Sequence, residues 1–181
     1  MVSYPNIPSN LRVPLFWAEM DNSEANTAQD SAPALLIGFA ATGSSIEKNK
    51  LTIMPSAALA GKLAGRGSQL ARMVAKYRSV DPFGELWIIA VDEPAGDAAT
   101  ATLTITGNAQ ASGTISLYVS TSRIQAAVVT GDTAATVATT LAAAINANAD
   151  LPVTATAAAG VITLTARHKG LAGNDIPLTV N

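Results

Sequence analysis

The sequence predicts a mixed fold: an α/β region with a partial parallel sheet and helices, followed by a smaller α+β module. The first observation is the apolar run LWIIAV at residues 86–91, whose continuity suits a strand covered on both faces. The second is the helical pattern and Asp-Pro turn before it, because helix, turn and buried strand together form half of a βαβ unit. The third is a change of composition near residue 96.

That change separates two unlike regions. Residues 1–96 hold 17 of the 24 Asp, Glu, Lys and Arg residues and seven of the eight Phe, Trp and Tyr residues. Beyond it, alanine and threonine dominate. We therefore expect an extended N-terminal arm over residues 1–32, an α/β region over 33–96 and an Ala/Thr-rich α+β module over 97–181.

The arm shows features of a segment that docks. Three prolines exclude a helix, and residues 21–31 are small and polar. An apolar cluster nevertheless lies between them, formed by Val13, Leu15, Phe16 and Trp17. An extended arm bound to another surface explains both features. Packing on its own domain explains them equally well, so both interpretations stay open.

The α/β region is predicted to hold two strands joined through two helices. Residues 34–40 predict the first strand, residues 51–54 are either a short strand or an extended lead-in, and Pro55 with Ser56 opens a helix that runs to Ala64. Ser68 is a good N-cap for the next helix, whose buried stripe is spaced at i, i+3, i+4 and i+7: Leu70, Met73, Val74 and Tyr77. Strands 34–40 and 86–91 should be parallel neighbours. Two strands do not make a stable sheet, so further strands must come from the second region, from other sequence or from a partner.

The second region predicts the order βββαββ with a further edge strand. Alternation predicts strands at 101–106, 114–120 and 123–129. Asp132 is the expected N-cap of a helix over 133–148, with Val137, Leu141 and Ile145 on its apolar face. Two strands, 153–157 and 161–166, flank Ala158-Ala159-Gly160 as a hairpin, and 176–180 is the last edge strand.

The sequence offers no enzyme site, metal site or cofactor site. The single histidine, His168, sits between Arg167 and Lys169, and we expect a solvated histidine in a loop or at a strand end. Gly61 to Ser68 lacks the Lys-Ser/Thr pair that ends a phosphate loop, so a helix–helix turn is expected there. There are no cysteines, which excludes disulfides and thiol chemistry.

Charge and hydropathy limit the partners. Hydrophobic residues are 49% and charged residues 13%, which indicates a packed protein. A net charge of −2 gives no electrostatic case for nucleic acid or an acidic membrane, and no apolar run reaches the roughly 20 residues of a membrane span. The second helix and the turn before it carry cations, among them Arg66, Arg72 and Lys76. These form either a solvated face or ion pairs between subunits.

Two stretches carry a resemblance to a known family. GRGSQLARMVAKYRSVDPFGELWIIAV, at residues 65–91, resembles the corresponding segment of tail sheath proteins of Mu-like contractile-tailed bacteriophages. IPSNLRVPLFWAE, at residues 7–19, resembles the N-terminus of the same proteins, as does Asp21-Asn22-Ser23 after it. The resemblance is specific over residues 7–91 and looser beyond, and the family's proteins are much longer than this chain.

The resemblance implies a structural role and no cofactor. Copies would stack in helical rings around a tail tube, with the baseplate as a further partner, and contract to drive the tube into the host. Such a subunit belongs to the virion tail and is assembled in the bacterial cytoplasm. Within it, residues 97–181 would be an inserted module, and the arm that reaches a neighbouring subunit would use Ile7, Leu11, Val13, Leu15, Phe16 and Trp17. The 181-residue chain alone is expected to be monomeric.

A different functional class also stays open on composition: an adhesin-like or glycan-binding virion surface module.

Overall fold

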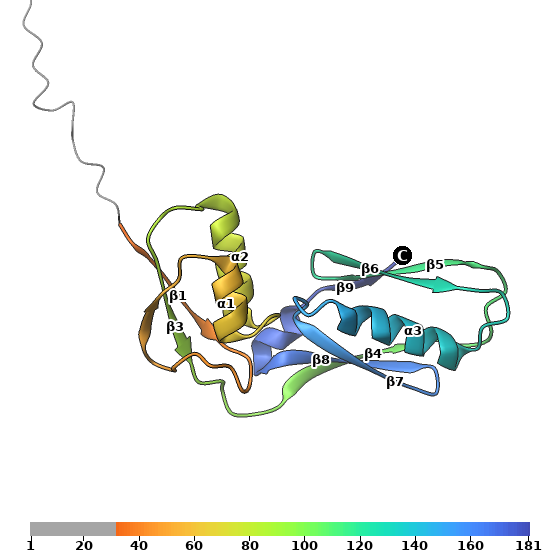
Figure 1. Cartoon of the computed structure of the whole chain (residues 1–181). Helices are drawn as coiled ribbons and strands as arrows, with labels where there is room; N and C mark the ends of the chain where they lie inside the picture. The colour runs from red at the N-terminus through yellow and green to blue at the C-terminus, as the bar shows by residue number, and fades with distance from the viewer. Residues whose placement is uncertain (1–31) are drawn as a thin grey trace, which may run out of the picture. The chain divides into compact units, whose positions relative to one another are not determined.

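A computed structural model describes residues 32–181 (Figure 1). Its first sheet has three strands in the order β1-β3-β2: β1 (Ala34–Phe39), β2 (Leu51–Ile53) and β3 (Leu86–Val91). β1 and β3 are parallel, in a register that runs from Ala34 opposite Leu86 to Phe39 opposite Val91. β2 adds an antiparallel strand on the other side of β3. One of the further strands that the sheet needs beyond β1 and β3 therefore comes from within this region.

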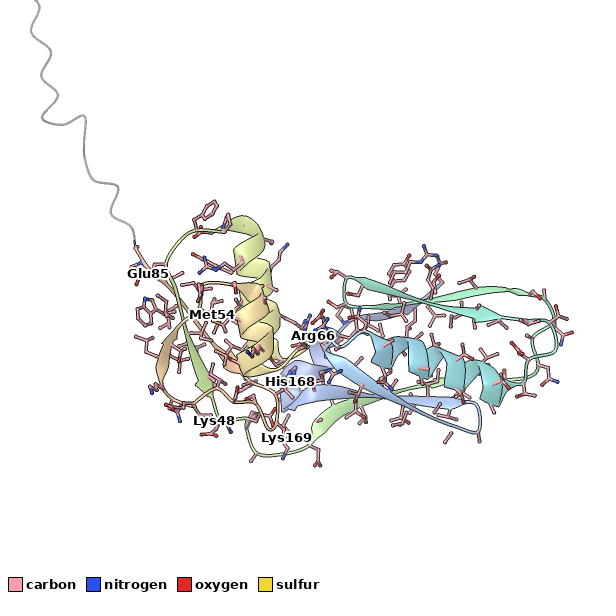
Figure 2. All side chains as sticks on the ribbon, viewed as in Figure 1. Lys48, Met54, Arg66, Glu85, His168 and Lys169 are labelled. Atoms are coloured by element: carbon pink, nitrogen blue, oxygen red, sulfur yellow. The ribbon has the colours of Figure 1, made fainter. Side chains whose placement is uncertain are left out.

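Two helices cover one face of this sheet. α1 (Ala57–Ala64) is capped by the Ser56 hydroxyl, and α2 (Gln69–Val80) by the Ser68 hydroxyl, each of which accepts a backbone N–H at 3.2 Å. Both caps fall where Ser/Thr N-cap chemistry places a helix start. Of the predicted stripe on α2, Leu70 and Val74 are fully buried, whereas Met73 and Tyr77 are half-buried. Met54, labelled in Figure 2, is fully buried in the same core.

The second region builds two more three-stranded sheets and a helix. One sheet has the order β4-β8-β7, from β4 (Ala98–Thr104), β8 (Val161–Lys169) and β7 (Val153–Ala158). The other has the order β6-β5-β9, from β6 (Ser122–Val128), β5 (Gly113–Val119) and β9 (Leu178–Val180). A 3-10 turn, η1 (Leu171–Asp175), precedes β9. The predicted order of elements is therefore present.

The helix α3 (Ala134–Ala147) packs against both of these sheets. Its predicted face, Val137, Leu141 and Ile145, is buried, and Leu141 and Ile145 share one apolar core with strands of both sheets. Alanines on the same helix, Ala138 and Ala142, are also buried there. Small side chains let a helix approach a sheet closely, which explains the alanine content of this stretch.

The hairpin between β7 and β8 turns on two residues, Ala159 and Gly160. Both have positive φ, 49° and 85°, as a two-residue type I′ turn requires. β8 is longer than the predicted strand and continues to Lys169. The strand ends elsewhere differ from prediction by a few residues, and β3 starts and ends at the predicted residues.

Two sequence predictions in this region are wrong. His168 is not solvated: it lies on the long β8 strand, is 6% exposed and stacks on Phe39 with ring centroids 6.1 Å apart. The alternation that buries Ile162, Leu164 and Ala166 simply continues to His168. Asp132 is not the N-cap of α3. Thr133 caps the helix, and Asp132 accepts the backbone N–H of Val129 instead.

Candidate assembly surfaces

One face of the first sheet is apolar and is not covered by any helix or strand of residues 32–181. α1 and α2 pack on the face that carries Leu86, Ile88 and Ala90, all fully buried. On the opposite face, the edge strands expose their apolar side chains by about half: Leu35 49%, Ile37 54%, Leu51 51% and Ile53 52%. The register places Leu35 and Ile53 on either side of Trp87, and Ile37 and Leu51 on either side of Ile89. We call these six residues the open sheet face.

The open sheet face has the composition of a buried surface. A parallel strand pair in a folded protein is almost always covered on both faces, and contiguous apolar patches on a protein surface mark contact sites. The sequence pattern already indicates a second covering layer, because the run at residues 86–91 is apolar on both faces, whereas the two helices cover only one face. The open sheet face is the strongest candidate contact surface in the described residues.

The cations of the predicted interface lie in different surroundings. Arg66, labelled in Figure 2, lies in the loop between α1 and α2 and already has a partner: its guanidinium forms an ion pair with Asp150 at 2.6 Å. This ion pair raises the pKa of Arg66 and lowers that of Asp150, through the side-chain hydrogen bond first. Arg72 is half-buried, and desolvation lowers its pKa. Lys76 is exposed. Within residues 32–181, neither Arg72 nor Lys76 forms an ion pair.

The other predicted interface residues cannot be placed. Ile7, Leu11, Val13, Leu15, Phe16 and Trp17 lie outside the described residues. Their role in an arm therefore stays a prediction.

Possible metal-binding side chains do not gather in one place in the described part of the chain. Residues 32–181 contain no group of three or more His, Asp or Glu side chains placed to hold a metal ion. In the same range, no helix combines the length and apolar composition needed to cross a bilayer. Asp92, which precedes another carboxylate in the sequence, is exposed and forms an ion pair with Lys48 at 2.7 Å. Asp92 and Lys48 thus form an ion pair on the protein surface.

Comparison with known proteins gives a consistent answer. Residues 94–180 match the family of phage tail sheath protein beta-sandwich domains. The Mu-like prophage FluMu tail sheath protein of Haemophilus influenzae is 41% identical over an alignment 183 residues long, which takes in 99% of this chain. The chain spans 38% of that relative's length. The resemblance to Mu-like phage tail sheath proteins read from the sequence is therefore confirmed: residues 94–180 match the phage tail sheath beta-sandwich domain, and nearly the whole chain is similar to part of a Mu-like prophage tail sheath protein.

Proposed function

We propose that this chain is the N-terminal part of a structural subunit of a contractile phage tail sheath. The observation that carries the proposal is 41% identity to a Mu-like tail sheath protein across 99% of the chain. In this role, copies assemble as helically stacked rings around a tail tube, on a baseplate, in the bacterial cytoplasm. The subunit acts mechanically, without cofactor, nucleic acid or membrane.

The open sheet face supports the proposed division of the chain. In our proposal, residues 33–96 begin a core sheet that later polypeptide of the longer subunit completes, and residues 97–181 are a module inserted into that core. A second layer on Leu35, Ile37 and their neighbours would bury side chains that are now about half exposed. Each Å² of apolar surface removed from water contributes roughly 25 cal/mol, so such a layer favours assembly of the complete core.

The proposed mechanism of contraction uses extended arms and rigid bodies. An arm formed by residues 7–19 would join each subunit to its neighbour while the folded regions move. Repeated contacts that do not close on themselves generate a helical tube, and extended segments keep such contacts linked during sliding. The extended tube would be kinetically trapped, and contraction would release free energy stored during assembly.

Immunolabelling tests the proposal in the source strain. Antibodies raised against the 181-residue chain should label contractile tails along the whole shaft, and the label should follow the sheath as it shortens. Serum absorbed with the same chain is the control. Labelling confined to fibres at the tail tip, or binding of the chain to host surfaces, would instead support the adhesin-like alternative. Absence of label from any tail would overturn the sheath proposal.

A further inference from the structure

An exposed aromatic residue is held on a fixed turn after α2. Phe83 is 96% exposed. The Asp81 carboxylate accepts the backbone N–H of Phe83 at 3.3 Å and that of Gly84 at 2.7 Å. Tyr77 donates its hydroxyl to the same carboxylate at 2.9 Å, and Arg78 donates to the carbonyl of Gly84 at 2.7 Å. The backbone at Phe83 is thus fixed in advance, which lowers the entropy lost when its ring binds a partner.

A groove of about 540 Å³ lies between α1 and the first half of α2. Small residues from both helices line it: Ala57, Ala58, Gly61, Ala71 and Ala75. Lys62 and Arg72 also line it, and neither forms an ion pair within residues 32–181. Arg66 and Asp150, at the same groove, neutralise each other. The groove is therefore apolar along its walls and carries net positive charge.

The turn and the groove lie at opposite ends of one helix. Along α2, residues 71, 72 and 75 line the groove, whereas the turn begins after Val80. A helix rises 1.5 Å per residue, so the turn lies about 10 Å or more beyond the groove and cannot fold back into it. The turn also carries the exposed carboxylate of Glu85, opposite in sign to Lys62 and Arg72. The turn of a second copy of the chain can therefore supply the surface that complements the groove.

We propose that the turn at residues 81–85 of one copy inserts Phe83 into the groove between α1 and α2 of the next copy. Glu85 then faces the positive charge of Lys62 and Arg72. The two surfaces differ, so the contact is head-to-tail and repeats without closing. This inference rests on the proposed function only in placing copies of the chain side by side. One such contact is smaller than a standard protein interface and is weak alone, but repetition in an array strengthens it through effective concentration.

Cysteine trapping measures this contact directly, because the chain has no cysteine of its own. Pro82→Cys places a thiol beside Phe83, and Ala58→Cys places one in the groove; both residues are exposed. Under mild oxidation, the double variant P82C/A58C should form a ladder of dimers, trimers and longer species. Two chains with one substitution each, when mixed, should stop at the mixed dimer.

Two matched controls separate the contact from random collision. Ala143 is an exposed residue of α3 that does not line the groove, so P82C/A143C also carries two thiols at exposed positions but lacks the proposed contact. Adding Phe83→Ala to P82C/A58C removes the ring, and because Phe83 is almost fully exposed the fold should be unchanged. Each control should cross-link at least about fivefold more slowly than P82C/A58C, as expected when a central aromatic contact is lost. Lys62→Glu should slow the reaction similarly, and adding Glu85→Lys to it should restore the rate.

Equal cross-linking rates for P82C/A58C and both controls would overturn the head-to-tail contact. A K62E/E85K pair that remains as slow as Lys62→Glu alone would also contradict it. Neither result affects the sheath proposal, because tail labelling is measured independently. If no tail is labelled but the cross-linking occurs as expected, the sheath proposal is wrong and the head-to-tail contact stands, in an assembly other than a tail sheath.

Discussion

Arg66 donates two parallel hydrogen bonds to Asp150, from Nε to Oδ1 at 2.8 Å and from Nη2 to Oδ2 at 2.6 Å. The two residues are 84 positions apart, in the loop after α1 and the loop after α3. Their side chains are 61% and 62% exposed, so water screens the pair. The two parallel hydrogen bonds fix the relative orientation of the two side chains, but the ion pair contributes little to the stability of the fold.

Asp150→Asn should lower the melting temperature slightly at neutral pH, by no more than about 4 °C. Arg66 lowers the pKa of Asp150, so the folded state favours the carboxylate. That contribution is present above the unfolded pKa of about 3.9 and is lost as pH falls through the lower folded value. The difference between wild type and variant should therefore disappear in acid, as thermal melts from pH 7 down to pH 2 can show.

Asp97→Asn is the matched control for this measurement, since Asp97 is exposed and forms no ion pair within the described residues. It should leave the melting temperature near the wild-type value throughout. A difference for Asp150→Asn that grows towards acid would contradict the assigned pairing.

Gly67→Ala should destabilise the protein strongly. Gly67 has a φ of +77°, and an added Cβ would lie 2.5 Å from the Leu151 carbonyl oxygen and 2.6 Å from that of Ala149. The left-handed conformation alone costs roughly 1–2 kcal/mol for a residue with a side chain. The backbone collision should bring the total to about 3–5 kcal/mol of unfolding free energy, measured by urea titration.

Gly107→Ala isolates the conformational part of that cost. Gly107 has nearly the same φ, +75°, but an added Cβ meets nothing within 4 Å. Gly107→Ala should therefore lower the unfolding free energy only by the conformational cost, roughly 1–2 kcal/mol. If both variants lose the same amount, the close approach of Gly67 to the loop at residues 149–151 is not what constrains this position.

Local rules predict much of this fold. Ser68 caps its helix as predicted, because the side-chain hydroxyl satisfies a backbone donor that no helix residue can reach. The apolar run bounded by a turn and by Asp92-Glu93 predicts the whole strand at Leu86–Val91, since it leaves little choice of limits. These features depend on neighbours in sequence, which one chain displays completely.

The remaining features depend on distant residues. The two cations beside His168 favour an exposed side chain, but His168 continues the buried face of β8 and stacks on Phe39, which lies on another sheet. Nothing in the sequence joins Arg66 to Asp150, because one charge pairs equally well with many others of opposite sign. Of the candidate interface, only the apolar character of the strands was visible in sequence. Which face the helices leave open is a property of the packed structure.

Substitutions on the two faces of the first sheet should have unequal effects. Ile88 is fully buried under the helices, and Ile88→Ala should cost about 2–5 kcal/mol of unfolding free energy. Ile37 is 54% exposed on the open sheet face, and Ile37→Ala should cost roughly 1 kcal/mol or less. Urea titration of both variants gives the comparison. Equal losses would mean that the open sheet face is already covered in this chain in solution.

Ala159→Asn should stabilise the protein. Ala159 is exposed at the β7–β8 turn and has a φ of +49°, a conformation that costs an L-residue roughly 1–2 kcal/mol. Asparagine tolerates this region better, and Asn-Gly is the preferred pair for a type I′ turn, so we expect a gain of about 0.5–1 kcal/mol. Gly160→Ala is the opposite control, because its φ is +85° and an added Cβ would lie 3.1 Å from the Ile105 carbonyl oxygen. That variant should lower the urea midpoint while Ala159→Asn raises it, and a lower midpoint for both would show that the turn is not type I′ in solution.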